Sequence, residues 1–303
     1  MEINRTELKA QARQAMRATT PRFWVITLVY ILLTTGVSLL LSLIFAFIPA
    51  NSESGFSSAS LFLSILQYLF TAVIGFGYTL WALWASRRMN PGLGALTQGF
   101  SISGRVILME VLIAVRMFCW LLLVVAAFLF LMTFTPLYML AASFPLAFEL
   151  FYLLIFAAAL AIMLRYALAP YLLADHPDDG PAIAIRRSVE YMRGWKMTLF
   201  KVELSFFGWL ALWMLLLVAV QAAALWYFGF FQLPAPTTLD EIVQQTANFS
   251  SIISHPLTVL ATTLVPLPLL LWYMPYRAVT LAGFYDLRLQ APQSPEYPTM
   301  PPV

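Results

Sequence analysis

Several charged side chains stand inside long apolar stretches of this chain, and four of them, Glu110, Arg165, Glu203 and Arg277, are candidates for one buried polar cluster. A charge in such a setting is costly and usually faces the interior of a helix bundle. Together the four could form a polar site that binds or carries a charged solute. The alternative is structural: carboxylate–arginine ion pairs, with arginine heads reaching toward lipid headgroups. We favour the structural interpretation.

Glu203 should have an arginine partner, because a lone carboxylate in hydrocarbon either protonates or finds a cation. Arg165 and Arg277 are the two candidates. Arg165 precedes Asp175 on one apolar stretch, so a continuous helix would place it about 15 Å deep. Ala161 and Ala169 lie on the same helix face as Arg165, and small residues there favour contact with another helix.

Motifs for catalysis or cofactor binding are absent from the sequence. Gly75-Phe76-Gly77 has no third glycine or lysine to cradle a phosphate. His176 and His255 have no metal-ligand partner at a suitable spacing, and the lone Cys119 stands between two aromatic residues, as expected for packing. We therefore expect no enzyme activity, no metal site and no cofactor.

The composition places these residues in a membrane. Of the 303 residues, 61% are hydrophobic and 10% are charged, whereas a soluble domain has about 25% charged residues. A transmembrane helix needs about 20 mostly apolar residues. The sequence predicts an all-α integral membrane protein with six such spans, at residues 23–48, 60–86, 110–134, 146–174, 198–230 and 256–284.

Basic residues decide the orientation, because short cytoplasmic loops collect lysine and arginine. The N-terminal segment, the second and fourth connections and the C-terminal tail contain them, whereas residues 49–59, 135–145 and 231–255 contain none. Both termini are therefore predicted to be cytoplasmic. Residues 1–285 should form one transmembrane domain, followed by a disordered proline-rich tail at 286–303.

Two basic segments are predicted to be amphipathic helices lying on the cytoplasmic leaflet. The first precedes span one and contains Arg5, Lys9, Arg13 and Arg17; the second precedes span five and contains Arg186, Arg187, Arg193 and Lys196. Asp178-Asp179-Gly180-Pro181 is typical of a helix start with an aspartate cap, and Gly194 of a helix stop. These charges either bind anionic lipid or only set the topology. On the outer side, Thr238 before Leu239-Asp240-Glu241 predicts a capped surface helix.

An internal repeat is suggested by the ends of the second and fourth spans. Aligning them places Tyr78 on Tyr166, Arg87 on Asp175 and Gly92 on Gly180. The predicted unit is a surface helix followed by a transmembrane hairpin, used three times, with 91–104 as the surface helix of the middle unit.

Four motifs support a family resemblance: Met192-Arg193-Gly194-Trp195-Lys196, Leu204-Ser205-Phe206-Phe207-Gly208-Trp209, Pro275-Tyr276 and Phe284-Tyr285. In these motifs the chain resembles the bacterial multi-pass family catalogued as domain of unknown function 975. The resemblance implies an α-helical protein of the bacterial inner membrane and supplies no activity. The chain is also distantly similar to the membrane domain attached to some glycerophosphodiester phosphodiesterases, which is not their catalytic part.

The leading hypothesis is a non-enzymatic membrane protein of envelope maintenance or scaffolding that contacts anionic lipids and no nucleic acid. The alternative is a small-solute or lipid transporter that uses the buried arginine and glutamate residues; six spans would then need a homo-oligomer to enclose a pathway. An intramembrane enzyme is a distant third.

Overall fold

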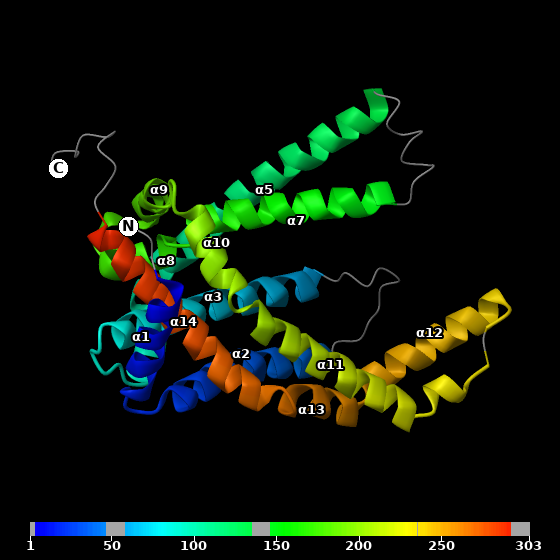
Figure 1. The fold of residues 1–303 in the computed structure, drawn as a ribbon. Helices are drawn as coiled ribbons and strands as arrows, with labels where there is room; N and C mark the ends of the chain where they lie inside the picture. The colour runs from blue at the N-terminus through cyan, green and yellow to red at the C-terminus, as the bar shows by residue number, and fades with distance from the viewer. Residues whose placement is uncertain (1–3, 47–57, 135–145, 235, 292–303) are drawn as a thin grey trace. The chain divides into compact units, whose positions relative to one another are not determined.

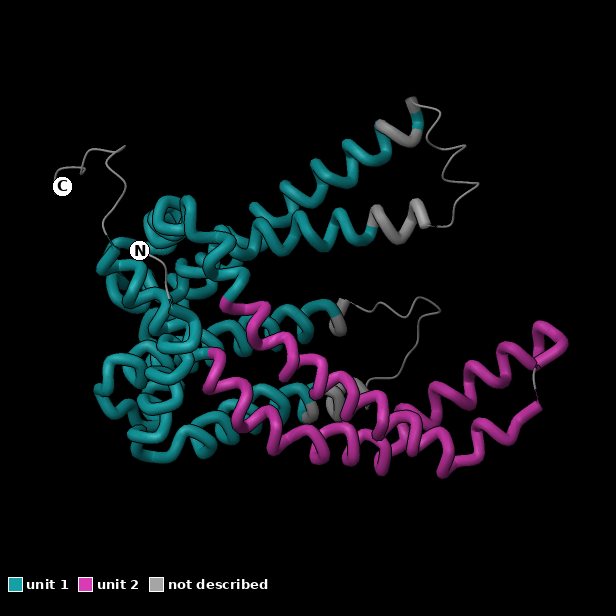
Figure 2. The backbone as a smooth tube through the Cα atoms, in the orientation of Figure 1, with its two compact units in different colours: residues 1–201, 278–303 teal, residues 202–277 magenta. Residues whose placement is uncertain are grey.

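The fold is known from a computed structural model that describes residues 4–46, 58–134, 146–234 and 236–291. Every regular element in these ranges is a helix (Figure 1). The chain divides into two compact units, residues 1–201 with 278–303 and residues 202–277 (Figure 2). Each unit is described by itself.

Unit 1 buries its core where short helices pack against the ends of long ones. The short helices are α1 (Arg5–Arg17), α4 (Gly94–Gln98), α8 (Ala169–Asp175) and α9 (Pro181–Tyr191), and the long ones include α3 (Ser58–Ser86) and α14 (Leu267–Gln290), of which the part from Ala278 belongs here. Trp81, Phe284 and Tyr285 are fully buried in this region. We call these short helices, with the ends of α3 and α14, the packed region.

Two glycines let α3 and the following turn approach closely. A Cβ atom on Gly77 would lie 2.2 Å from the carbonyl oxygen of Leu96, and one on Gly99 would lie 2.5 Å from that of Val73. Gly99 begins a 3-10 turn, η1 (Gly99–Ile102), directly after α4. The expected surface helix at 91–104 is therefore a short element packed against α3, with Leu96 buried.

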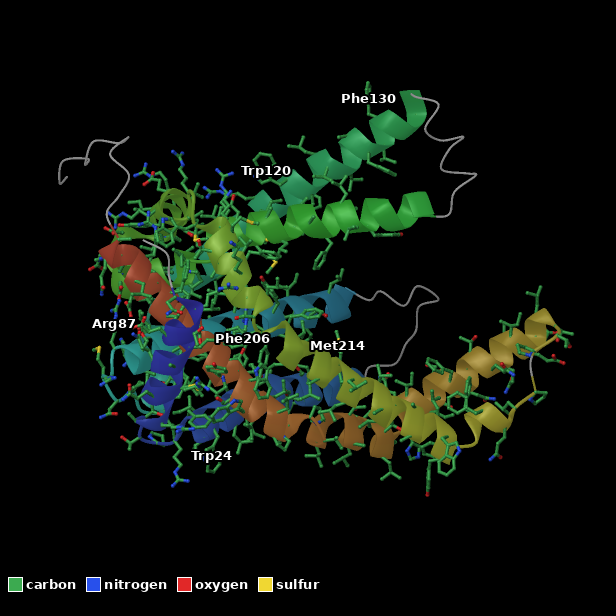
Figure 3. The ribbon with its side chains drawn as sticks, viewed as in Figure 1. Trp24, Arg87, Trp120, Phe130, Phe206 and Met214 are labelled. Carbon is green, nitrogen blue, oxygen red and sulfur yellow. The ribbon has the colours of Figure 1, made fainter. Side chains whose placement is uncertain are left out.

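The hairpin of α5 (Ser103–Phe134) and α7 (Leu146–Tyr166) extends from this packed region. Phe118 and Phe130 on α5 are 66% and 60% exposed, and Phe156 on α7 is 65% exposed. Figure 3 shows Trp120 and Phe130 along α5. Apolar surface on this scale needs a covering medium. The remaining long helix, α2 (Phe23–Ala46), contacts α3.

Unit 2 contains α11 (Phe207–Tyr227), a turn η3 (Phe230–Gln232), α12 (Leu239–Ser254) and α13 (Pro256–Leu264), followed by the first part of α14. The predicted cap of α12 is confirmed: Thr238 accepts the backbone N–H of Glu241, and the Glu241 carboxylate accepts the N–H of Thr238 in return. This reciprocal arrangement satisfies two donors that a helix start otherwise leaves without partners.

Four helices in the described ranges are long and apolar enough to cross a membrane, and α13 with α14 makes a fifth if the pair, bent by 43°, is one span. Residues Phe23–Ser38 form a shorter apolar helix. The chain is thus an all-helical protein with several long apolar helices, as a membrane protein requires.

Three of the predicted continuous spans are broken. The fourth breaks between α7 and α8, the fifth between α10 (Lys196–Leu204) and α11, and the sixth before Leu267. At the second break the Ser205 hydroxyl donates to the carbonyl of Val202 at 2.5 Å, which is how a serine competes with the helical hydrogen-bond pattern. Apolar composition alone does not reveal these breaks.

The predicted tail begins later than expected, because α14 continues to Gln290. Residues 292–303, like most of the outer connections at 49–59 and 135–145, lie outside the described residues.

Candidate functional site

Three arginines from three helices line one cavity of about 580 Å³ in unit 1. Arg116 comes from α5, Arg165 from α7 and Arg186 from α9, and each pair of these helices is in contact. The rest of the wall is aromatic or aliphatic and consists of Trp120, Tyr166, Ala182, Ile183 and Val189. No carboxylate is among the lining residues.

The break between α7 and α8 positions Arg165. Ser188 on α9 donates its hydroxyl hydrogen to the carbonyl of Arg165 at 3.1 Å and accepts the N–H of Leu168 at 3.2 Å. Ser188 is fully buried and so satisfies backbone groups that the break frees. Arg165 consequently stands in the last turn of α7, at the end of an apolar helix. The continuous helix that would have placed it mid-span is not formed.

The charges around this cavity are not balanced by the protein. Among the described residues, none of the three arginines has a carboxylate within ion-pair distance. Arg165 also has a buried Nε with no hydrogen-bond partner there. Nearby basic residues differ: Arg187 is paired with Asp179, and Arg105 with Asp178. Uncompensated like charges that share a cavity favour a bound anion.

A second arginine site, in the packed region, is fully paired. Arg87 holds Asp175 through two bonds of 2.7 Å and Asp286 through bonds of 3.0 and 2.7 Å. Ser86 donates to Asp286, and Tyr285 donates to Asp175. The hydrogen bonds that Arg87 donates to Asp175, and then those it donates to Asp286, hold the pKa of Arg87 above its usual value. We call these five residues the Arg87 network; it joins the ends of α3, α8 and α14.

Sequence reasoning placed Arg87 and Asp175 at equivalent repeat positions without recognising that they would bond. Tyr285 belongs with them, because Tyr78–Arg87, Tyr166–Asp175 and Tyr276–Tyr285 have the same separation in sequence. That shared spacing is the signal that could have found the network. No comparable signal pointed to Trp120, or to Arg116 as a neighbour of Arg165.

In unit 2, Glu203 binds Arg277 through hydrogen bonds of 2.8 and 2.5 Å. Of the two arginines considered for Glu203, Arg277 is the one that pairs with it. The pair is half-buried, with side-chain exposures of 26% for Glu203 and 43% for Arg277. A two-bonded guanidinium–carboxylate contact satisfies both partners and leaves little capacity for a solute.

Glu110, in unit 1, does not line the arginine cavity. It lines a smaller cavity of about 190 Å³ together with the hydroxyl-bearing Tyr68, Thr71 and Thr79. No ion pair involves Glu110 within the described ranges. The structure therefore separates Arg165 from Glu110 and joins Glu203 to Arg277.

The basic residues of α1 lie on its outer side. Arg5, Arg13 and Arg17 are exposed, and Lys9 is half-buried. Burial, and then the neighbouring charges of Arg13 and Arg5, lower the pKa of Lys9. The apolar face of α1 differs from the expectation: it is buried in unit 1 instead of facing the leaflet, through Leu8, Ala12, Ala15 and Met16.

The second basic helix is also docked on the protein. Ile185 and Met192 of this segment are fully buried, whereas Arg186 and Arg193 are exposed and Lys196 is half-buried. The predicted aspartate cap of α9 is wrong: Gly180, at φ +80°, occupies the cap position. The predicted stop at Gly194 agrees with its φ of +74°, which glycine adopts without steric cost.

The family described as "Protein of unknown function (DUF975)" matches residues 1–291. The chain belongs to the DUF975 family. No curated protein and no solved structure matches it. In the described part of this DUF975 chain, no three histidine, cysteine, aspartate or glutamate side chains are grouped to hold a metal ion.

Proposed function

We propose that this DUF975 protein is a non-enzymatic integral protein of the bacterial inner membrane, which maintains or scaffolds the envelope by holding anionic lipid on its cytoplasmic side. In this proposal it crosses the membrane six times, α2 being one span and α13 with α14 another. Both termini are cytoplasmic, because α1 and the connections after α3 and α8 contain most of the basic residues, whereas residues 49–59, 135–145 and 231–255 contain none.

One observation carries the proposal: the protein itself covers the apolar face of α1. Leu8 and Met16 are 2% and 1% exposed, and a Cβ atom on Gly283 would lie 3.0 Å from the side chain of Leu8. Arg5, Arg13 and Arg17 are thereby held on a docked helix. Charges that only set topology need no fixed geometry, whereas a fixed basic row is suited to headgroups, each residue contributing about 1 kcal/mol near an anionic surface.

The experiment is lipid retention after purification in mild detergent. Replacing Arg5, Lys9, Arg13 and Arg17 with glutamine should reduce the anionic lipid seen by native mass spectrometry. A matched control replaces the three arginines with lysine, which keeps the charge and should keep the lipid. Unchanged lipid in the glutamine variant would contradict the proposal and leave these residues with a topogenic role only.

The same proposal includes the threefold repeat. Its units would be α1 with α2 and α3, then α4 with α5, α7 and α8, then α9 with the helices from α10 to α14. The contacts between residues at equivalent positions support it. Arg87 and Tyr285 both donate hydrogen bonds to Asp175.

The second candidate is a transporter of a small solute or lipid, supported by the broken helices at Leu168, Phe206 and Pro266. Discontinuous helices are a recurring feature of transporter binding sites. Uptake of solute by proteoliposomes, with a homo-oligomer in detergent, would favour it. Retained anionic lipid without any uptake would favour the scaffold.

A further inference from the structure

We propose that the cavity lined by Arg116, Arg165 and Arg186 is a specific site for the head of an amphiphile that has two phosphate groups. The inference rests on the proposed function, from which it takes the membrane setting. It names a specific binding site, one ligand per chain and the class of ligand, in addition to the general attraction between α1 and anionic lipid.

Charge and donor geometry select phosphate. The cavity has three guanidinium groups on its wall and no acidic side chain. A guanidinium offers parallel N–H donors that match two oxygens of a phosphate group. The buried Nε of Arg165 is such a donor, without an acceptor in the described part of the chain. Buried donors are nearly always satisfied in native proteins, so a ligand oxygen is the expected acceptor.

Size and charge favour two phosphate groups over one. The cavity volume of about 580 Å³ lies within the usual range for ligand sites, about 300–1,000 Å³, and exceeds what a single phosphate would fill. Three positive charges are also poorly balanced by the single negative charge of one phosphodiester. Two linked phosphate groups leave the site nearer neutrality.

The apolar part of the wall indicates that the ligand has acyl chains. Trp120 follows Arg116 by one helical turn on α5, and Leu123 lies on the same face one turn further along. Leu123 is 60% exposed. A head held by the arginines would therefore meet a tryptophan, which prefers the level of the headgroups, and then an open apolar helix face along which a chain can lie.

The test measures binding to the full chain in mild detergent by native mass spectrometry and by thermal shift. The probes are tetraoleoyl cardiolipin, which has two phosphate groups, dioleoyl phosphatidylglycerol, which has one, dioleoyl phosphatidylcholine as a zwitterion, and sodium pyrophosphate. The variants are Arg165→Gln and Arg165→Lys. Arg88→Gln is the matched control, because it removes one positive charge from an exposed residue that belongs neither to the cavity nor to the basic row of α1.

We expect one cardiolipin per chain, bound about tenfold or more tightly than phosphatidylglycerol. Arg165→Gln should weaken cardiolipin binding about tenfold or more, as loss of a hydrogen bond to a charged group does. Arg165→Lys should weaken it nearly as much, since lysine lacks the planar fork. Arg88→Gln should leave this affinity unchanged. Cardiolipin affinity equal in wild type and Arg165→Gln would overturn the site.

Two further outcomes separate the alternatives. Pyrophosphate binding that depends on Arg165, with cardiolipin not bound, would identify a free anion and overturn the lipid assignment. If Arg165→Gln fails to fold, Arg116→Gln and Arg186→Gln are measured, and unchanged cardiolipin binding in both would overturn the proposal. The glutamine variant of α1 separates the proposed function from this site. If that variant loses anionic lipid while Arg165→Gln leaves cardiolipin binding unchanged, the proposed function stands and this site is rejected.

Discussion

The packed region of unit 1 and its α5–α7 hairpin are made of similar apolar residues, and they differ in what covers those residues. Trp81 and Phe284 are fully buried by neighbouring helices, whereas Phe118 and Phe130 project from α5 with 66% and 60% of their surface exposed. The packed region behaves like the interior of a soluble protein, whereas the hairpin exposes apolar surface that needs a covering medium. Close packing and paired charges should therefore matter most in the first region.

The charged sites repeat this contrast. The Arg87 network supplies its own carboxylates and is complete within the chain. The cavity of Arg116, Arg165 and Arg186, where the hairpin meets α9, has none. An arginine site whose charges the protein itself pairs stabilises the fold, whereas one without carboxylate partners at the start of an exposed apolar hairpin is available to a ligand.

The largest expected effect is that of Arg87→Gln. The change leaves Asp175 and Asp286 facing each other without a cation, with 16% and 22% of their side chains exposed. The free energy of unfolding should fall by about 2–4 kcal/mol, less than for a fully buried pair because water reaches part of the network. Denaturant unfolding in mild detergent measures it. Arg88→Gln is the control, since the Arg88 side chain donates to the uncharged side chain of Gln14 and forms no ion pair within the described ranges; equal losses would refute the network's role.

Gly77→Ala should give the next largest loss. Its new Cβ atom would lie 2.2 Å from the backbone oxygen of Leu96, and backbone moves less easily than a flexible side chain. We expect about 1–3 kcal/mol of destabilisation, as for overpacking in a core. Gly36→Ala on α2 has nothing within 4 Å of its Cβ and should be neutral in the same unfolding experiment. A neutral Gly77→Ala would show that α4 does not pack closely on α3.

The Glu203–Arg277 pair should contribute less, because it is more exposed than the Arg87 network. Glu203→Gln is expected to lower the free energy of unfolding by about 1–2 kcal/mol. The double change to Glu203→Leu and Arg277→Leu should recover much of that loss, since it leaves no unpaired charge. In a double-mutant cycle, strictly additive losses from Glu203→Leu and Arg277→Leu would mean that the two side chains are not coupled.

The smallest effect concerns α12 and depends on pH. Hydrogen bonds from the backbone and then the hydroxyl of Thr237, and from the backbone of Thr238, lower the pKa of Glu241 below its usual 4.5. A lowered folded-state pKa means that this stabilisation is complete above pH 4.5 and is lost as the pH falls through the folded value. Protection of the backbone amides at the start of α12 against hydrogen exchange, relative to the intrinsic exchange rate at each pH, should therefore fall under acid. Glu241→Gln should remove that pH dependence, and an unchanged profile in this variant would argue against the cap.

Much of the helical order could be predicted from the sequence, because each of its signals is local. Apolar runs mark the long helices, Thr238 with Glu241 marks the start of α12, and Gly194 marks a stop. The aspartate cap of α9 could not be recognised as wrong from the sequence, because Asp179 pairs instead with Arg187, eight residues further along the chain. The local sequence shows which residues are able to cap a helix, whereas contacts such as the Asp179–Arg187 ion pair determine which residue occupies the cap position.

By itself the sequence determined the protein's all-helical, membrane-protein character and the set of arginines that must be accommodated, because hydropathy and charge are properties of composition and order. Only the tertiary structure decided which arginines are neutralised. Arg165 was predicted beside a glutamate, yet Ser188 ends its helix and α9 brings Arg186 to the same cavity. The hydrogen bonds of Ser188 on α9 stabilise the break between α7 and α8, and that break determines which residues surround Arg165. These contacts join separate helices, so no local sequence pattern could have shown them.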